Sequence, residues 1–279
     1  MHSEQAADRR LSPFIWFSRE EWSRLRTPTS LSLSEDDVRN LWRIAEHLSA
    51  EEATEVYLPL SWLLYLHVSA TQDLYQKAHA FLSQEETEVP YVVGLAGSVA
   101  AGKSTVAQVL QALISRWPEN PRVELVSTDG FLYPNRVLQS RGLMDRKGFP
   151  ESYDLQLLLR FLADVKSGLV EVSAPIHSHL IYDILPDRVQ AIARPDVLIV
   201  EGLNMLEAGL PEPSDGHRVF VSDYVDFSIY VDAEERHLRE WYLHRFLRLR
   251  EEALVDDSAH FRRFASLSIE EATEVALRV

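Results

Sequence analysis

Residues 91–105 read Tyr-Val-Val-Gly-Leu-Ala-Gly-Ser-Val-Ala-Ala-Gly-Lys-Ser-Thr. Their second half fits the pattern G-x-x-x-x-G-K-[S/T], a loop that binds nucleotide phosphates through its backbone N–H groups. Glycine at both ends of the pattern lets the backbone turn tightly where a β-carbon would obstruct a phosphate. An apolar run enters the loop as a strand would, and residues 105–114 leave it with a helical pattern. Strand, loop and helix in this order predict a binding site for a nucleoside triphosphate.

The last two residues of the pattern have distinct chemical roles. In loops of this kind the lysine reaches the β- and γ-phosphates, and the hydroxyl that follows it can bind Mg²⁺. These roles fall on Lys103 and Ser104. The predicted nucleotide-binding residues are Gly97, Ser98, Val99, Ala100, Ala101, Gly102, Lys103 and Ser104.

Length and composition limit the classes of protein to consider. The chain has 279 residues, enough for one large α/β domain or two small ones. Its net charge of −15 disfavours nucleic acid and anionic membranes as partners. It has no cysteine, which excludes disulfides and thiol catalysis. The N-terminus lacks a signal pattern, and the most apolar region, residues 57–70, is too short to span a bilayer, so we expect a cytoplasmic protein.

The pattern of apolar residues changes near residue 90. Before it, helices are expected over 34–48, from Ser49 onward, and over 60–82 after an interruption at Pro59. After it, short apolar strands alternate with helices, which predicts an α/β fold with a mostly parallel sheet flanked by helices. We therefore expect a helical extension over 1–89 packed on a phosphate-loop core over 90–279, as a single domain. The expected core elements are strands 91–96, 123–128, 170–174, 197–200 and 224–231, and helices 153–166, 234–251 and 268–279.

Three acidic residues follow predicted strands. Asp129, Glu201 and Asp232 stand where parallel sheets bind ligands, beyond the carboxyl ends of their strands. Glu201 fits a Mg²⁺ site best, either directly or through water. Asp129 follows the strand after the loop helix, where a base that activates a hydroxyl would be useful. A turn or helix-cap role stays open for both, and it is the better interpretation for Asp232, which precedes a helix.

Two further groups of residues could carry chemistry. Arg245, Arg248 and Arg250 lie on one predicted helix, and their spacing allows only one of them to reach over the phosphates. His177 and His179 have the spacing of metal ligands on an extended strand, but no cysteine or third histidine accompanies them. Zinc is therefore disfavoured, and polar contacts to a substrate or plain surface placement are the better interpretations.

Beyond the loop, long segments of the chain resemble the bacterial type I pantothenate kinases, a branch related to uridine kinases. The resemblance covers nearly the whole chain, and several segments are long enough to be specific to this family. The matching segments are Leu33–Asp36, Tyr57–Ser61, Leu95–Thr105, Ser127–Asn135, Arg141–Met144, Lys147–Asp154, Ser178–Asp183, Glu201–Asn204, Val219–Asp223, Val225–Asp232 and Trp241–Phe246.

The resemblance implies phosphorylation of pantothenate by ATP, the first committed step toward coenzyme A. It also implies a homodimer and feedback inhibition by coenzyme A that competes with ATP. By motif, Ser104 and Glu201 would organise Mg²⁺, and Asp129 would accept or orient the hydroxyl proton. Lys103 and Arg245 would stabilise charge on the transferred phosphoryl group. The pantothenate pocket would be lined by His179, Tyr182 and Tyr242.

The chain departs from the family pattern in three respects. It stops at Val279 inside an expected helix, several tens of residues short of the family's usual end, where an asparagine that contacts pantothenate and a group near the adenine are expected. Gln108 stands where the family commonly has an arginine beside the phosphates, which bears on coenzyme A feedback. Ala45 and His260 replace polar and aromatic residues expected near the adenine and the substrate.

Two alternative functions follow from these observations. A kinase of another small hydroxyl compound, such as a nucleoside, would share the phosphate loop and the strand-end acids. A nucleotide-binding remnant without turnover would result if the short C-terminus impaired catalysis. A substrate panel separates the first alternative from pantothenate kinase, and thermal stabilisation by ATP without turnover would indicate the second.

Overall fold

The computed structural model describes residues 14–25, 41, 43, 48–83, 89–206, 219–254 and 260–277. Most of the helix expected over 34–48 lies outside these ranges. The helices are α2 Arg19–Ser23, α4 Ala50–Glu52, α5 Leu58–Leu82, α6 Lys103–Ile114, α7 Asn135–Ser140, α8 Leu155–Lys166, α9 Glu235–Glu252 and α10 Ile269–Ala276. The strands are β1 Tyr91–Gly97, β2 Val123–Ser127, β3 Val172–Ser178, β4 Asp183–Ile192, β5 Val197–Glu201 and β6 Phe227–Val231.

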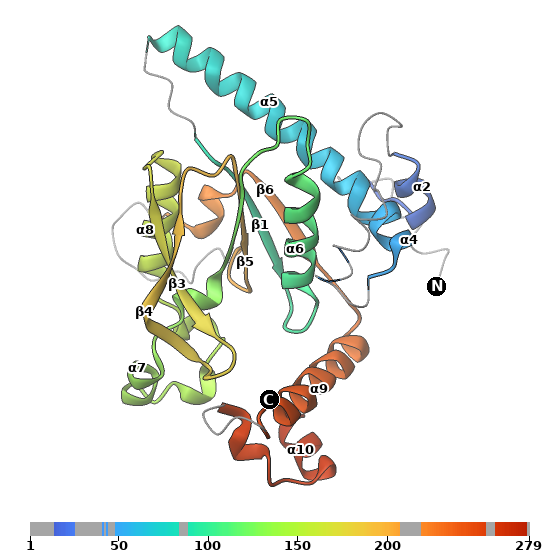
Figure 1. The fold of residues 1–279 in the computed structure, drawn as a ribbon, viewed down its shortest axis with the longest axis vertical. Coiled ribbons are helices and arrows are strands. Elements are labelled where there is room, and N and C mark those ends of the chain that lie inside the picture. The colour runs from blue at the N-terminus through green and yellow to red at the C-terminus, as the bar shows by residue number, and fades with distance from the viewer. Residues whose placement is uncertain are drawn as a thin grey trace.

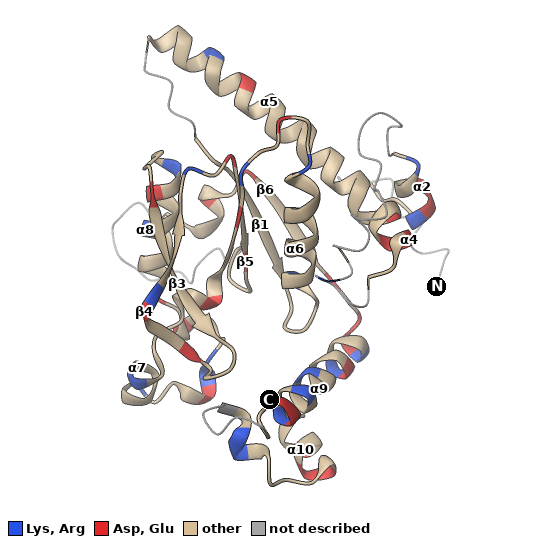
Figure 2. Ribbon diagram, viewed as in Figure 1, with Lys and Arg blue, Asp and Glu red and all other residues tan. Residues whose placement is uncertain are grey.

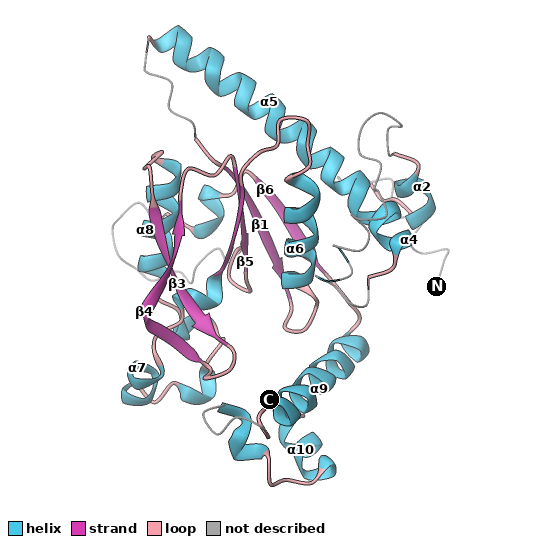
Figure 3. Cartoon of the chain, in the orientation of Figure 1, coloured by secondary structure: helices cyan, strands magenta, loops and turns pink. Residues whose placement is uncertain are grey.

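A four-stranded parallel sheet in the order β2-β5-β1-β6 forms the centre of the molecule (Figures 1 and 3). Every residue of β1 and β5 is buried, as expected for central strands of a parallel sheet that is covered on both faces. The register pairs Leu95 of β1 and Ser127 of β2 with Glu201 of β5. The predicted α/β class with a mostly parallel sheet is confirmed.

The two faces of the sheet carry separate apolar cores. Val92 and Ala96 of β1 point toward α8 and the β3–β4 hairpin, in a buried cluster that includes Leu158 and Leu162. The alternate residues of β1 point to the other face, where α6 and α5 cover the sheet. Leu64 and Val68 anchor the middle of α5 in that second cluster. The C-terminal end of α5 projects beyond the rest of the molecule (Figure 1).

The sequence predicts that Pro59 interrupts the N-terminal helices, but the structure shows no interruption at this residue. The chain runs from α4 through a π-helical stretch, Ala53–Tyr57, directly into α5, with Pro59 in the first turn of α5. Proline lacks an N–H donor, and Pro59 follows directly after the π-helical stretch, whose last bond runs from the Leu58 N–H to the Ala53 carbonyl oxygen. The residue without a donor thus stands where the helical bonding pattern changes. Ser49 caps α4 as expected, because its hydroxyl accepts from the Glu52 N–H at 2.9 Å.

The antiparallel hairpin β3–β4 is the largest difference from the predicted fold. The sequence predicts only a short strand over 170–174, whereas β3 continues to Ser178 and β4 pairs back against it. Half of the residues of β4 are exposed and it contains a proline, so it lacks the apolar alternation that identifies a strand. Two boundaries also differ: β6 begins at Phe227, after a 3-10 turn, and α10 ends at Ala276 rather than at Val279.

No helix in the part of the chain that the structure describes has the length and apolar character needed to cross a bilayer.

Gly202 lets the ends of β2 and β5 lie against each other. A β-carbon at this position would stand 1.8 Å from the hydroxyl oxygen of Thr128, which is fully buried. We expect Gly202→Ala to lower the free energy of unfolding by about 1–3 kcal/mol, because the two strand ends must separate to admit the methyl group. Urea unfolding of the variant measures this loss. The double variant Gly202→Ala/Thr128→Ala should recover part of this loss. If the effects of the two substitutions simply add, the contact between residues 202 and 128 is contradicted.

Candidate active site

The phosphate loop joins β1 to α6 in the backbone conformation that its glycines allow. Gly102 has φ +89° and directly precedes the first residue of α6, Lys103. The Lys103 ammonium donates to the carbonyl oxygens of Gly97 at 3.0 Å and Ser98 at 2.9 Å. Burial lowers the pKa of Lys103, while the nearby carboxylates of Glu201 and Asp129 oppose that shift. The loop therefore holds a partly desolvated cation over the N-terminus of a helix, a favourable place for phosphate.

Ser104 and Glu201 meet at the base of this loop. The Ser104 hydroxyl donates to Glu201 Oε1 at 3.0 Å, and only 7% of Glu201 is exposed. Burial raises the pKa of the Glu201 carboxyl, and hydrogen bonds from Ser127 and Ser104 oppose the shift. A hydroxyl and a carboxylate oxygen side by side are ligands that Mg²⁺ prefers, so this pair fits a hard divalent cation.

Asp129 stands in the first turn after β2, a 3-10 turn over Thr128–Phe131. The Tyr153 hydroxyl donates to Asp129 Oδ1 at 3.2 Å. Burial and the charge of Asp129 raise the pKa of Tyr153, which keeps this phenol protonated as a donor. Asp129 acts electrostatically on Lys103 and Glu201, so the two strand-end acids and the loop lysine share one site. The carboxylate is half-buried and therefore accessible to a bound ligand.

The β3–β4 hairpin brings aromatic and polar side chains to the same place. The ring of His177 lies 5.3 Å from that of His179 and 5.6 Å from that of Tyr182, measured between centroids. Asp129 acts electrostatically on all three of these groups. The hairpin thus places its end opposite the carboxylate that follows β2.

Helix α9 contributes the last predicted residues. Arg245 acts electrostatically on Lys103 and His179, and Tyr242 acts on Tyr182. The other two arginines of this helix are engaged elsewhere: Arg248 pairs with Glu252 at 3.6 Å, and Arg250 donates to backbone carbonyls that precede α10. Figure 2 shows α9 as a helix with charges of both signs along its length. Of the three arginines only Arg245 thus acts on the described site residues, which agrees with their spacing in the sequence.

Asp232 does not join the site. Its carboxylate accepts from the neighbouring Ala233 N–H at 3.0 Å, as a turn residue does. The N-cap position of α9 belongs to Glu234. The sequence-based preference for a turn role at Asp232 is therefore correct, although the cap lies two residues later.

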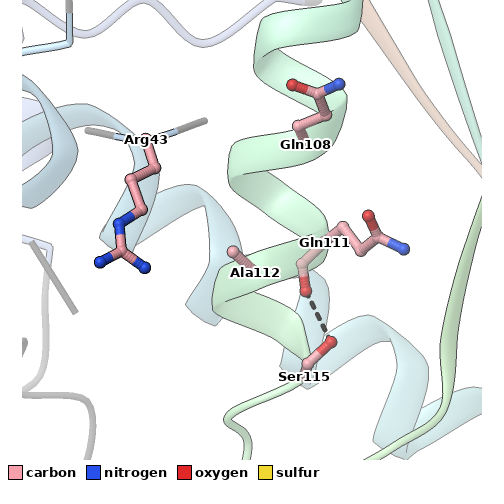
Figure 4. A pocket seen from close by; sticks show the side chains of 5 residues that line it. All are labelled: Arg43, Gln108, Gln111, Ala112 and Ser115. Carbon is pink, nitrogen blue, oxygen red and sulfur yellow. Dashed lines mark hydrogen bonds between the residues drawn. The ribbon is translucent and has the colours of Figure 1, made fainter. Parts of the chain in front are cut away.

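An open pocket of about 600 Å³ lies beside α6, lined by Arg43, Gln108, Gln111, Ala112 and Ser115 (Figure 4). Figure 4 shows Gln108 one helical turn before Gln111 and Ala112, with Arg43 on the facing segment. The Ser115 hydroxyl donates to the Gln111 carbonyl oxygen at 2.8 Å, and the Gln111 amide donates to the Val123 carbonyl oxygen at 3.0 Å. None of the residues predicted for catalysis lines this pocket.

Comparison with known proteins extends what the geometry indicates. The model of the Phosphoribulokinase / Uridine kinase family matches residues 92–256. The chain is 55% identical to a pantothenate kinase of Brevibacillus brevis over 95% of its own length and 83% of the relative's. It is 51% identical to a pantothenate kinase of Escherichia coli O1:K1 / APEC, over 96% of its own length and 84% of the relative's. The chain belongs to the pantothenate kinase family.

One solved structure supports the same architecture. A Silicibacter sp. TM1040 protein named for a fructose transport system kinase superposes with a TM-score of 0.50 at 25% sequence identity. The superposition covers 72% of this chain and 94% of that protein. This pantothenate kinase family member is thus an enzyme of the kinase class with a phosphate-loop core.

Sequence reasoning missed two residues that touch this kinase site. Tyr153 donates to Asp129, and Lys147 donates to Asn135 Oδ1 at 2.7 Å and to the Tyr182 carbonyl oxygen at 2.5 Å. Both lie in the segment Lys147–Asp154 that resembles the family. That resemblance was the only available signal, because no spacing rule links Tyr153 to a carboxylate 24 residues earlier.

Because of Lys147, the free energy of unfolding of this family member is expected to change with pH in the alkaline range. Burial lowers the pKa of Lys147 to about 8, below its value in an unfolded chain. Between these two pKa values the unfolded chain binds more protons, so the free energy of unfolding rises as pH rises. Lys147 is partly exposed, so solvent screening reduces the effect of this shift. We expect the free energy of unfolding to rise between pH 7 and pH 9.5 by about 1 kcal/mol more in the wild type than in Lys147→Met. Urea unfolding at both pH values tests this, and equal pH dependence in the two proteins would contradict it.

Proposed function

We propose that this protein transfers the γ-phosphoryl group of ATP to the primary hydroxyl of pantothenate, giving 4′-phosphopantothenate and ADP. The observation that carries the proposal is the position of Asp129. This carboxylate shares the site with the Ser104–Glu201 pair of the phosphate loop, and it also faces the hairpin that carries His179 and Tyr182. A base between a nucleotide site and a polar pocket suits transfer to a hydroxyl acceptor. The pantothenate kinase names of the relatives supply the identity of that acceptor.

On the nucleotide side, Gly97 to Ser104 would hold the ATP phosphates, and Ser104 and Glu201 would hold Mg²⁺. The bound Mg²⁺ would neutralise charge on the β- and γ-phosphate oxygens. Lys103 would exchange its two carbonyl partners for phosphate oxygens, which a flexible ammonium can do without moving the backbone. Arg245 would add a second positive charge from α9.

On the acceptor side, Asp129 would take the hydroxyl proton as the oxygen attacks phosphorus. The bond between the γ-phosphorus and the bridging oxygen breaks, and ADP leaves with the electron pair of that bond. Tyr153 would orient Asp129 through its hydrogen bond. His179, Tyr182 and Tyr242 would hold the polar groups of pantothenate. Phosphoryl transfer depends on such positioning and on neutralising oxygen charge, so no covalent enzyme intermediate is required.

The direct test incubates the purified chain with MgATP and pantothenate and follows 4′-phosphopantothenate by mass spectrometry. We expect product formation that depends on pantothenate. Uridine and other small hydroxyl compounds in parallel assays test the alternative acceptor. No product from any acceptor, with ATP still raising the melting temperature, would overturn the proposal in favour of nucleotide binding without turnover.

Homodimer formation and the division into an extension over 1–89 and a core over 90–279 belong to the same proposal. In support, α5 exposes large apolar side chains along its length, and its far end projects beyond the body (Figure 1). An exposed apolar stripe of this kind is typical of an interaction surface. Sedimentation of the purified chain tests the dimer. The exposed apolar residues of α5 are Leu66, Leu74, Phe81 and Leu82.

Coenzyme A feedback and a cytoplasmic location are further parts of the proposal. Gln108 brings no charge to the pocket beside α6, but Arg43 lines the same pocket. We therefore expect coenzyme A to compete with ATP more weakly than in a relative with arginine at this position, and inhibition assays at varied ATP measure that competition. Among the described residues no helix could span a membrane, which agrees with a location in the cytoplasm.

A further inference from the structure

Asp129, His177 and His179 form a cluster in which only His177 has no role in the proposed transfer reaction. Each offers one ligand atom, and the three atoms lie within 4.8 Å of one another. We propose that these three residues bind a divalent transition-metal ion such as Zn²⁺, and that the bound ion blocks the acceptor site. The second part rests on the proposed function, because it requires Asp129 to receive the acceptor hydroxyl.

The fold builds this cluster from two segments that are distant in the sequence. His177 lies near the end of β3 and His179 is the first residue of the turn that follows it, and the centroids of their rings are 5.3 Å apart. Gly130 brings Asp129 to them, because a β-carbon at Gly130 would stand 2.1 Å from the carbonyl oxygen of Pro175 in β3. The close approach of β3 to the turn after β2 therefore depends on this glycine.

The environment of His177 leaves both of its ring nitrogens available to a ligand. Both of its ring nitrogens are buried, and neither has a hydrogen-bond partner within the described structure. Buried polar atoms without partners are costly and uncommon. The neighbouring rings of His179 and Tyr182 pack against His177 edge-on and fix its orientation without satisfying its nitrogens. A metal ion held with Asp129 would give one of these nitrogens a strong partner.

The donor set selects the class of ion. Two imidazoles and one carboxylate, with further positions open to water, suit Zn²⁺, Co²⁺ or Fe²⁺. Mg²⁺ prefers oxygen ligands and would remain at the Ser104–Glu201 pair. The sequence disfavours zinc because no third ligand accompanies the two histidines, but the tertiary structure supplies that ligand as Asp129.

Occupation of this cluster would prevent transfer for a simple reason. A carboxylate bound to a dication cannot accept the proton of the acceptor hydroxyl. The ion and its water ligands would also occupy the position beside Asp129 that the acceptor hydroxyl needs. Inhibition by the ion should therefore compete with pantothenate and leave ATP binding intact.

Cobalt titration of the full chain tests the site itself. We expect Co²⁺ to bind with visible d–d absorption of low-symmetry nitrogen and oxygen coordination, in the presence of excess Mg²⁺ and without nucleotide. In His177→Phe, which keeps an aromatic ring but no ligand atom, affinity measured by chelator competition should fall at least about tenfold. This minimum applies because even the loss of a residue that only supports a ligand costs 10–100-fold. His237→Phe makes the same change on α9, where the ring stacks on Trp241 at 5.7 Å, and should bind Co²⁺ as the wild type does.

Equal Co²⁺ affinity in His177→Phe and the wild type, with both proteins folded by circular dichroism, would overturn the site. Should the phenylalanine variant fail to fold, His177→Gln provides the same comparison. Loss of binding in either variant, with retention in His237→Phe, supports the site even if the chain phosphorylates a different acceptor.

Zinc inhibition tests the blocking role. At free Zn²⁺ fixed by a metal buffer, we expect the apparent KM for pantothenate to rise with little change in the KM for ATP. The inhibition constant should be at least about tenfold weaker in His177→Phe. Inhibition that competes with ATP instead, or that is unchanged in His177→Phe, would overturn the blocking role and leave the cobalt result to decide the site. Absence of any turnover without zinc would count against the proposed function and not against the metal site.

Discussion

Asp129→Asn is expected to lower kcat for pantothenate phosphorylation by about 10²–10⁴-fold, the usual contribution of a positioned general base. Asparagine keeps the size of the side chain and an oxygen for the Tyr153 hydroxyl, which donates to Asp129 Oδ1 at 3.2 Å. It cannot accept the hydroxyl proton. Steady-state kinetics at saturating ATP and pantothenate measure the effect.

The same variant should bind ATP as the wild type does, because the phosphate loop and the Ser104–Glu201 pair are unchanged. Thermal shift with ATP checks this. Asp187→Asn is the matched control: Asp187 is exposed on β4, and its replacement should leave kcat unaltered. Equal loss of ATP binding and rate in Asp129→Asn would argue for a general electrostatic role in place of a base.

Lys103→Met is expected to reduce kcat/KM for ATP by about 10²–10³-fold, as removal of one group that stabilises transition-state charge commonly does. Methionine preserves much of the side-chain volume but has no charge. Lys103 is partly desolvated and lies over the loop carbonyls of Gly97 and Ser98, so its attraction for phosphate oxygens is weakly screened. Initial rates at varied ATP measure the loss.

Lys77→Met provides the control for removal of a lysine. Lys77 is exposed on α5 and pairs with Asp73. Its replacement should change kcat/KM by less than about twofold, since exposed pairs contribute little. A loss in Lys77→Met comparable to that in Lys103→Met would show that net charge, and not the loop position, governs the effect.

The parallel sheet was predictable because its signals are local. β1 and β5 are continuous apolar runs, and the glycine-lysine pattern between strand and helix defines the loop. The β3–β4 hairpin was not predictable in the same way. Half of the residues of β4 are exposed, and its partner β3 packs against the turn after β2, where Gly130 meets Pro175. Tertiary contact decides such a strand, and local periodicity does not record it.

The same distinction applies to the site. Asp129 and Glu201 follow predicted strands, so the rule for parallel sheets places them together, and the structure agrees. His177 needed the tertiary structure, because its partner Asp129 lies 48 residues earlier and on another strand end. Spacing identifies ligands within one element, whereas the third member of this cluster comes from a different element.

The contact between Gly130 and Pro175 also has an evolutionary consequence. The groups expected to hold ATP and its metal ion belong to the parallel sheet, whereas His179 and Tyr182 belong to the hairpin. The two units meet beside Asp129, where Gly130 in the turn after β2 lies against the backbone carbonyl of Pro175 in the hairpin. Side chains of the hairpin can therefore change without disturbing the nucleotide half. Relatives that share the loop but phosphorylate other alcohols should have diverged chiefly in this hairpin, which makes it the segment to exchange when a new acceptor is sought.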